Sequence, residues 1–236
     1  MISFHENTQQ LSTGEILGPE SFIEKLKNTG LDIAMTETLL EKTADILVTV
    51  RNSLPDMFSI SFNLDAPVHD RDHKSVIRSC SEFRKTVGSC CGELICELTE
   101  CAPWLNDSTE FLDKLREEGI KIALDDFGTG FSTLTLLEET EADYIKLDRH
   151  FIRNISYDPS SWKMAECIIF IAKTYSMRII AEGVENAFQS DWLRSRGIDL
   201  QQGYYFSSPV DADMFTRQVV SGIFSINRHE RDTFFL

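Results

Sequence analysis

Residues 120–134, IKIALDDFGTGFSTL, constrain the fold of this chain more than any other segment. An apolar run over 120–124 leads directly into two adjacent carboxylates, Asp125 and Asp126. Such a run is typical of a buried parallel strand. In closed α/β barrels, active sites lie at the carboxyl ends of these strands. The segment therefore predicts a strand that carries two acids to a catalytic rim, with an exposed acidic turn as the alternative.

The paired carboxylates also point to a metal ion. Two ionised groups this close repel each other unless a proton or a cation lies between them. Carboxylate oxygens are the ligands that hard divalent cations prefer. We therefore expect a divalent metal next to Asp125 and Asp126.

Length and charge limit the possible classes of protein. The chain has 236 residues, 42% of them apolar, and a net charge of −15. This length suits one large α/β domain, so we expect a single domain over residues 1–236. An acidic chain repels nucleic acid and anionic membranes, so neither is expected as a partner. Because no apolar run reaches about 18 residues and no signal peptide is recognisable, we expect a cytoplasmic protein.

Strand-like and helix-like segments alternate along the chain. This pattern predicts a parallel sheet built from βα units, an α/β fold of the TIM-barrel kind. The expected strands are 57–63, 93–97, 120–124, 144–147, 177–182 and 201–206. The expected helices are 19–30, 31–53, 67–87, 108–118, 133–139, 161–175, 186–196 and 212–224.

Each expected strand ends in a group that can bind metal or phosphate oxygen. These groups are Asn63, Glu97, Asp125 with Asp126, Lys146, Glu182 and Gln202. Asparagine and carboxylate oxygens suit Mg²⁺, Mn²⁺ or Ca²⁺. A lysine among them can orient or deprotonate a water molecule, or neutralise a phosphate. The pattern indicates two-metal hydrolysis of a phosphodiester.

Six short motifs resemble those of the EAL family, the bacterial cyclic di-GMP phosphodiesterases. The resemblance covers about residue 19 to the C-terminus and implies a modified (β/α)8 barrel of EAL type. The matching motifs are SFNLDA at 61–66, ELTE at 97–100, DDFGTGFSTL at 125–134, YIKLD at 144–148, AEGVE at 181–185 and QGYYFSSP at 202–209.

The resemblance implies roles for individual residues. The metals would be Mg²⁺ or Mn²⁺, the first held by Asn63, Glu97 and Asp125 and the second by Asp125, Asp126 and Glu182. Lys146 matches the lysine that contacts the catalytic water, and Gln202 matches the glutamine near that site. The family loop that orders the second metal and the dimer face corresponds to Glu100, Phe127, Gly128, Thr129 and Gly130, so a homodimer is one possibility.

The beginning of the sequence departs from the family pattern. The family starts with a strand of the YQPIV type and a second strand ending in Glu-Ala-Leu, whose glutamate is a first-metal ligand. The alignment places that motif near residues 1–4, which read Met-Ile-Ser-Phe and contain no glutamate. In an alternative alignment Glu20 is the ligand, but residues 19–31 then no longer match the first helix of the family. Glu6 lies nearer the expected place but lacks the residues that flank the family motif. We therefore expect a barrel incomplete at its N-terminal strands and a weakened first metal site.

Two functions remain open at this point. The first is an EAL-like regulator without phosphodiesterase activity. It would bind cyclic di-GMP or a protein partner, such as the flagellar master activator FlhD–FlhC, and control motility or biofilm genes. The second is an active metal-dependent phosphodiesterase that hydrolyses cyclic di-GMP to linear pGpG, with another carboxylate as ligand or a true start upstream. An unrelated metal-dependent barrel enzyme is a third interpretation, which the motif combination disfavours.

Two further sets of residues carry smaller expectations. The six cysteines include no CxxC pair and no histidine at zinc-finger spacing, so we expect buried free thiols, with a zinc site as a weak alternative. The aromatic run Tyr204, Tyr205 and Phe206 either stacks on a guanine at the barrel rim or packs in the core.

Overall fold

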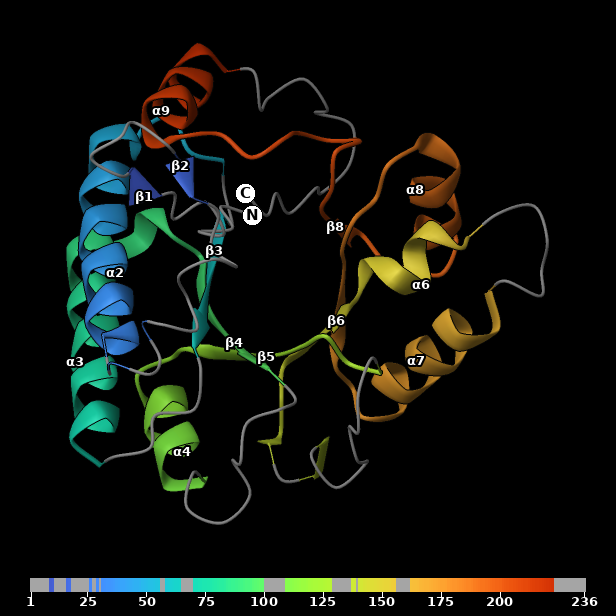
Figure 1. The fold of residues 1–236 in the computed structure, drawn as a ribbon, viewed down its shortest axis with the longest axis horizontal. Coiled ribbons are helices and arrows are strands. Elements are labelled where there is room, and N and C mark those ends of the chain that lie inside the picture. Colours follow the sequence, from blue (N-terminus) through green and yellow to red (C-terminus); the bar gives the residue numbers. More distant parts are fainter. Residues whose placement is uncertain are drawn as a thin grey trace.

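The computed structural model describes residues 9–10, 16–17, 26, 29, 31–55, 58–64, 70–99, 109–128, 137–138, 140–155 and 162–222. Within these ranges, six parallel strands form one sheet whose order follows the sequence. They are β3 (Ser59–Leu64), β4 (Glu93–Thr99), β5 (Lys121–Asp125), β6 (Tyr144–Leu147), β7 (Arg178–Ala181) and β8 (Leu200–Gln201). The sheet curls into part of a barrel, which confirms the predicted α/β fold (Figure 1). A short antiparallel pair, β1 (Gln9–Gln10) and β2 (Ile16–Leu17), precedes it.

Helices cover the outer face of the curled sheet (Figure 1). Along the first half of the sheet lie α2 (Asp32–Val50), α3 (Asp70–Val87) and α4 (Thr109–Glu117), with the short 3-10 helix η2 (Gly88–Cys90) after α3. Along the second half lie α6 (Arg149–Arg153), α7 (Lys163–Thr174) and α8 (Ala187–Arg194), and α9 (Ala212–Ser221) contacts α2. None of the described helices is long and apolar enough to cross a bilayer.

Local sequence explains where several helices begin and end. In α2 the buried residues Leu40, Ala44 and Leu47 recur every three to four positions and face the core. The Asp211 carboxylate accepts the backbone N–H of Met214 at 2.7 Å and so caps the start of α9. Gly222, with φ of 70°, ends the same helix in the left-handed conformation.

The observed elements agree with most of the predicted ones to within a few residues, although β1, β2 and η2 were not predicted and two further differences lie near the carboxyl ends of the strands. The strand predicted over 201–206 ends at Gln201, because Gly203 begins a turn in which its carbonyl accepts the N–H of Phe206 at 3.0 Å. The short helix α6 was not predicted, since its sequence RHFIR has no repeated apolar spacing. Most of the helices predicted over 19–30 and 133–139, together with residues 1–4, lies outside the described residues.

Two smaller expectations also need correction. The cysteines are free as expected, but only Cys80 and Cys96 are buried, and Cys167 is exposed on α7; Cys101 lies outside the described residues. Burial raises the pKa of the Cys80 thiol to about 12. The aromatic run at 204–206 does not pack in the core, because its three side chains are 73%, 46% and 45% exposed.

A buried apolar layer fills the inside of the curled sheet. It consists of one residue from each of five neighbouring strands: Ile95, Ala123, Tyr144, Ile180 and Leu200. A second, larger core lies between the sheet and its helices. Because successive side chains of a strand point to opposite faces, the residues two positions before and after this inner layer share its orientation. The residues two positions before and after the inner layer therefore point to the inside of the barrel, at its two opposite ends.

A polar cluster lies at the end where the strands begin. The Tyr144 hydroxyl donates to the Glu93 carboxylate and accepts from Arg178 Nη1 at 2.6 Å. The Arg178 guanidinium also lies over the Tyr144 ring, 5.1 Å from its centroid. Burial and the bond to Glu93 raise the pKa of Tyr144 above its ordinary value. This end of a barrel contributes to stability rather than to chemistry.

Replacing the Tyr144 hydroxyl tests this assignment. Tyr144→Phe is expected to lower the free energy of unfolding by about 1–2 kcal/mol, because Glu93 and Arg178 lose a partly buried hydrogen-bonding partner. Urea unfolding followed by circular dichroism measures the change. Tyr175→Phe is the matched control, since its hydroxyl lies 3.4 Å from Glu138 at the surface. Equal losses in the two variants would contradict the assignment.

Candidate active site

The predicted site residues lie at the opposite end of the barrel, two positions beyond the apolar layer. Glu97, Asp125 and Lys146 follow Ile95, Ala123 and Tyr144 on strands β4, β5 and β6. Glu182 and Gln202 follow Ile180 and Leu200 just beyond β7 and β8. Strand alternation therefore turns all five toward the inside of the barrel. We call these five residues the rim cluster.

Lys146 lies at the centre of the rim cluster and is 1% exposed. Its ammonium nitrogen is 2.6 Å from Glu97 Oε2, 3.0 Å from Asp125 Oδ1 and 2.7 Å from Glu182 Oε1. Three carboxylates from three strands thus converge on one cation. The sequence predicted Lys146 as a contact to water or phosphate, whereas the structure shows it holding the acids together.

The charges of the rim cluster shift the proton affinities of its members. Burial by itself would lower the pKa of Lys146, but Glu97, Glu182 and Asp125 outweigh it and raise that pKa above its ordinary value. Burial raises the pKa of Glu182 to about 7, Asp125 and Glu97 add to the rise, and Lys146 opposes it. Lys146 therefore stays protonated, while Glu182 is the member whose proton is exchangeable near neutral pH.

The loops after β7 and β8 hold Glu182 and Gln202 against each other. The Gln202 side-chain amide donates to Glu182 Oε1. Val184 donates its N–H to the Gln202 carbonyl at 3.0 Å and accepts from the Tyr205 N–H at 2.9 Å. A Cβ on Gly203 would lie 2.3 Å from the backbone N and O of Val184, so only glycine allows the two loops to approach this closely.

The remaining predicted residues occupy varied positions. Asn63 is exposed at the end of β3, in register with Glu97 on β4. Asp126 is exposed and has a positive φ of 55°, although it is not glycine. In the following loop Phe127 is buried, and a Cβ on Gly128 would lie 3.3 Å from the Phe151 ring. Glu100, Thr129 and Gly130 lie outside the described residues.

The rim cluster has the donor chemistry that a hard divalent cation prefers, although its carboxylates are arranged around Lys146. Glu97 Oε1 and Gln202 Oε1 are buried and lack a hydrogen-bond partner among the described residues. Three carboxylates facing one ammonium leave two formal negative charges uncompensated, which a cation would offset. The carboxylates surround Lys146 rather than a shared vacant position, and no group of three His, Cys, Asp or Glu side chains in the described part is arranged to hold a metal.

Sequence reasoning missed the contribution of Gly183, of Gly203 and of helix α6. Gly183 has φ of 68°, and a Cβ there would lie 2.3 Å from Arg149 Cβ. Gly183 thus lets α6 approach the loop that carries Glu182. The spacing of Arg149 and Arg153, four residues apart just after a strand, was the available signal that α6 presents two cations on one side.

Removing the central ammonium should destabilise the fold. Lys146→Met is expected to cost about 3–5 kcal/mol of unfolding free energy in chelator, because three buried or half-buried carboxylates lose their counter-charge. Adding Mg²⁺ or Mn²⁺ should restore part of the loss. Urea unfolding with and without the cation measures both effects. Lys121→Met is the control, since Lys121 and Asp143 form a half-exposed pair at 2.6 Å; it should cost no more than about 1 kcal/mol.

Glu182 predicts a pH dependence of stability in metal-free protein. Its pKa rises from 4.5 to about 7 on folding, so between these values the folded state keeps a proton that the unfolded state has released. Stability should therefore fall as pH rises through this interval. Thermal unfolding in chelator from pH 5 to pH 8, at about one-unit steps, measures the slope. Glu182→Gln should flatten it, and an unchanged slope would contradict the assignment.

Comparison with known proteins adds sequence relatives. The family model described as EAL domain matches residues 8–209. The probable cyclic di-GMP phosphodiesterase PdeG of Escherichia coli K12 is 35% identical over 202 residues, covering 84% of this chain and 39% of that protein. The cyclic di-GMP phosphodiesterase PdeL of the same strain is 34% identical over 207 residues, covering 87% of this chain and 57% of PdeL. The chain thus spans only part of the length of these relatives.

Solved structures share the fold. The EAL enzyme Bd1971 in a cGMP-bound form superposes with a TM-score of 0.78 at 26% identity, covering 90% of this chain and 59% of that chain. The PaMucR phosphodiesterase in complex with c-di-GMP superposes with a TM-score of 0.74, also at 26% identity, covering 88% of this chain and 84% of that chain.

Proposed function

The chain belongs to the EAL domain family, and on this premise we propose that it is a metal-dependent phosphodiesterase that hydrolyses cyclic di-GMP to linear pGpG. The observation that carries the proposal is the convergence of Glu97, Asp125 and Glu182 on Lys146. Building such a cluster of like charges costs stability, which is typical of a functional site rather than of a structural one.

Each residue of the rim cluster has a proposed role. Glu97, Asp125 and Glu182, with Asn63 and Asp126 beside them, would hold Mg²⁺ or Mn²⁺. A divalent cation, when bound, supplies positive charge beside the phosphodiester and makes water more acidic. Gln202 keeps one Glu182 oxygen in place through its amide N–H. Lys146 holds the three carboxylates together through its ammonium. In a chain with a net charge of −15, the divalent cation would also offset the repulsion of a phosphate.

The loop after β5 would order the second metal position. Phe127 anchors that loop in the core, which fixes the backbone directly after Asp126. Positive φ at Asp126 and at Gly128 turns the chain sharply at this point. We expect Glu100, Thr129 and Gly130 to complete the loop, as the family resemblance implies.

Turnover of the cyclic dinucleotide tests this function. Overnight incubation of cyclic di-GMP with the protein and Mn²⁺, followed by chromatography, should yield linear pGpG. Asp125→Ala and Glu97→Gln should each reduce the rate at least about a hundredfold, since each removes a carboxylate that would hold the divalent cation. Asp113→Ala on α4, where the carboxylate is exposed and pairs with Arg116, should retain the wild-type rate. No product from wild-type protein would refute the proposal.

Binding without turnover is the second candidate function. The observation that favours it is the sequence Met-Ile-Ser-Phe at 1–4, where the resemblance places the family glutamate. Calorimetric titration of cyclic di-GMP in Ca²⁺, combined with the Mn²⁺ incubation, separates the two, because tight binding without pGpG after the Mn²⁺ incubation would identify a nucleotide-binding regulator. The FlhD–FlhC partner, a role in motility or biofilm genes, and a homodimer stay predictions, and a pull-down with purified FlhD–FlhC tests the first of them.

A further inference from the structure

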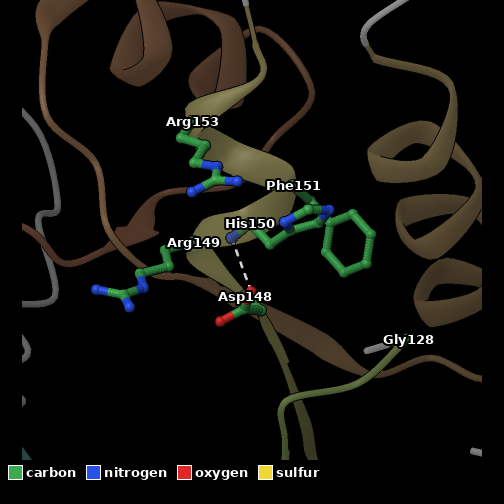
Figure 2. A pocket seen from close by; sticks show the side chains of 6 residues that line it. All are labelled: Gly128, Asp148, Arg149, His150, Phe151 and Arg153. Atoms are coloured by element: carbon green, nitrogen blue, oxygen red, sulfur yellow. Dashed lines mark hydrogen bonds between the residues drawn. The ribbon is translucent and has the colours of Figure 1, made fainter. Parts of the chain in front are cut away.

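A pocket separate from the rim cluster opens beside α6. Its volume is about 480 Å³, and it is lined by Gly128, Asp148, Arg149, His150, Phe151 and Arg153 (Figure 2). Asp148 lies two residues beyond Lys146, and Gly128 lies two residues beyond Asp126. The pocket is therefore built by the same chain segments that carry the rim cluster, but none of the five rim-cluster residues lines it.

The pocket concentrates positive charge in an acidic protein. Arg149 and Arg153 stand four residues apart, which places them on one side of α6. Neither guanidinium forms an ion pair or hydrogen bond with any described residue. Both are exposed, in a chain with a net charge of −15. Like charges at this spacing destabilise a helix slightly, and a bound anion would offset that repulsion. The arrangement therefore suits an anionic ligand.

The pocket wall is held in place by packing and capping. Arg149 Cβ lies against Gly183, so its stem starts from a fixed point next to the loop that carries Glu182. The Asp148 carboxylate accepts the His150 N–H at 2.7 Å and caps α6. Phe151 is buried, and Figure 2 shows Arg149 extending from α6 to the side opposite Phe151. The two guanidinium groups thus extend from a rigid base.

We propose that this pocket binds the terminal phosphate of a nucleotide, with Arg149 and Arg153 as its ligands. Two guanidinium groups match a phosphomonoester, which carries close to two negative charges at neutral pH, better than a phosphodiester, which carries one. Opening a cyclic dinucleotide creates such a terminal phosphate. The inference depends on the proposed function only for the choice of a guanine nucleotide. Among the described residues that line the pocket, Asp148 is the acidic one, and its carboxylate is engaged by the α6 backbone.

Calorimetric titration of the whole chain with GMP, in chelator and at low salt, tests the proposal. We expect GMP and pGpG to bind, guanosine not to bind, and inorganic phosphate to bind more weakly than GMP. The double variant Arg149→Gln, Arg153→Gln should weaken GMP binding at least about tenfold, because two charge-assisted contacts are lost. Glutamine keeps the length of both stems, and a thermal midpoint equal to that of wild type confirms folding. Arg217→Gln on α9, an exposed arginine far from α6, is the matched control and should bind GMP normally (Figure 1).

The outcomes separate this inference from the phosphodiesterase proposal. Chelator removes the cations that cyclic di-GMP hydrolysis needs, so GMP binding in chelator reports on the pocket alone. GMP binding retained in Asp125→Ala supports a site distinct from the rim cluster. The inference is overturned if GMP does not bind at millimolar concentration, if guanosine or inorganic phosphate binds as tightly as GMP, or if the double variant binds like wild type. If the protein hydrolyses cyclic di-GMP but does not bind GMP, the inference about the pocket is overturned while the phosphodiesterase proposal stands.

Discussion

The rest of the site depends on the ion pairs that the ammonium of Lys146 forms with three carboxylates. Glu97, Asp125 and Glu182 come from three different strands, and they would repel one another without a cation between them. One buried lysine offsets only part of their charge. The cluster therefore stays together in metal-free protein while keeping a deficit of positive charge. A divalent cation would offset that deficit and could bind Glu97 Oε1, which has no hydrogen-bond partner in the described part of the chain.

Strand alternation divides the inside of the barrel into functional and structural ends. Residues two positions before the apolar layer, such as Glu93 and Arg178, form a self-contained polar cluster around Tyr144. Residues two positions after it form the rim cluster. Parallel strands place every carboxyl end at the same edge, so five separate segments deliver their polar groups to one place. The same geometry explains why the site needs an intact sheet.

Close backbone contacts connect the rim cluster to the neighbouring pocket. Gly203 lets the loop after β8 touch Val184, and Gly183 lets α6 touch the loop after β7. Glu182 lies between these contacts. A ligand held by Arg149 would therefore lie next to the loop that carries Glu182, because Arg149 Cβ lies against Gly183. The rim cluster and the pocket beside α6 are carried by the same chain segments, but the rim cluster has a net negative charge and the pocket a net positive charge.

The strand–helix order, the family and the identity of the rim residues can be predicted from the sequence, because apolar runs, turn-forming glycines and motif spacing are local properties. The strand over 144–147 has the bounds that the sequence predicts. The sequence also predicts that all five rim-cluster residues lie at strand ends. The folded chain is needed to see that Lys146 bridges three carboxylates, that the side chains at 204–206 are exposed, and that α6 forms a pocket wall. These features depend on distances between segments far apart in the chain, and neither periodicity nor motif spacing encodes such distances.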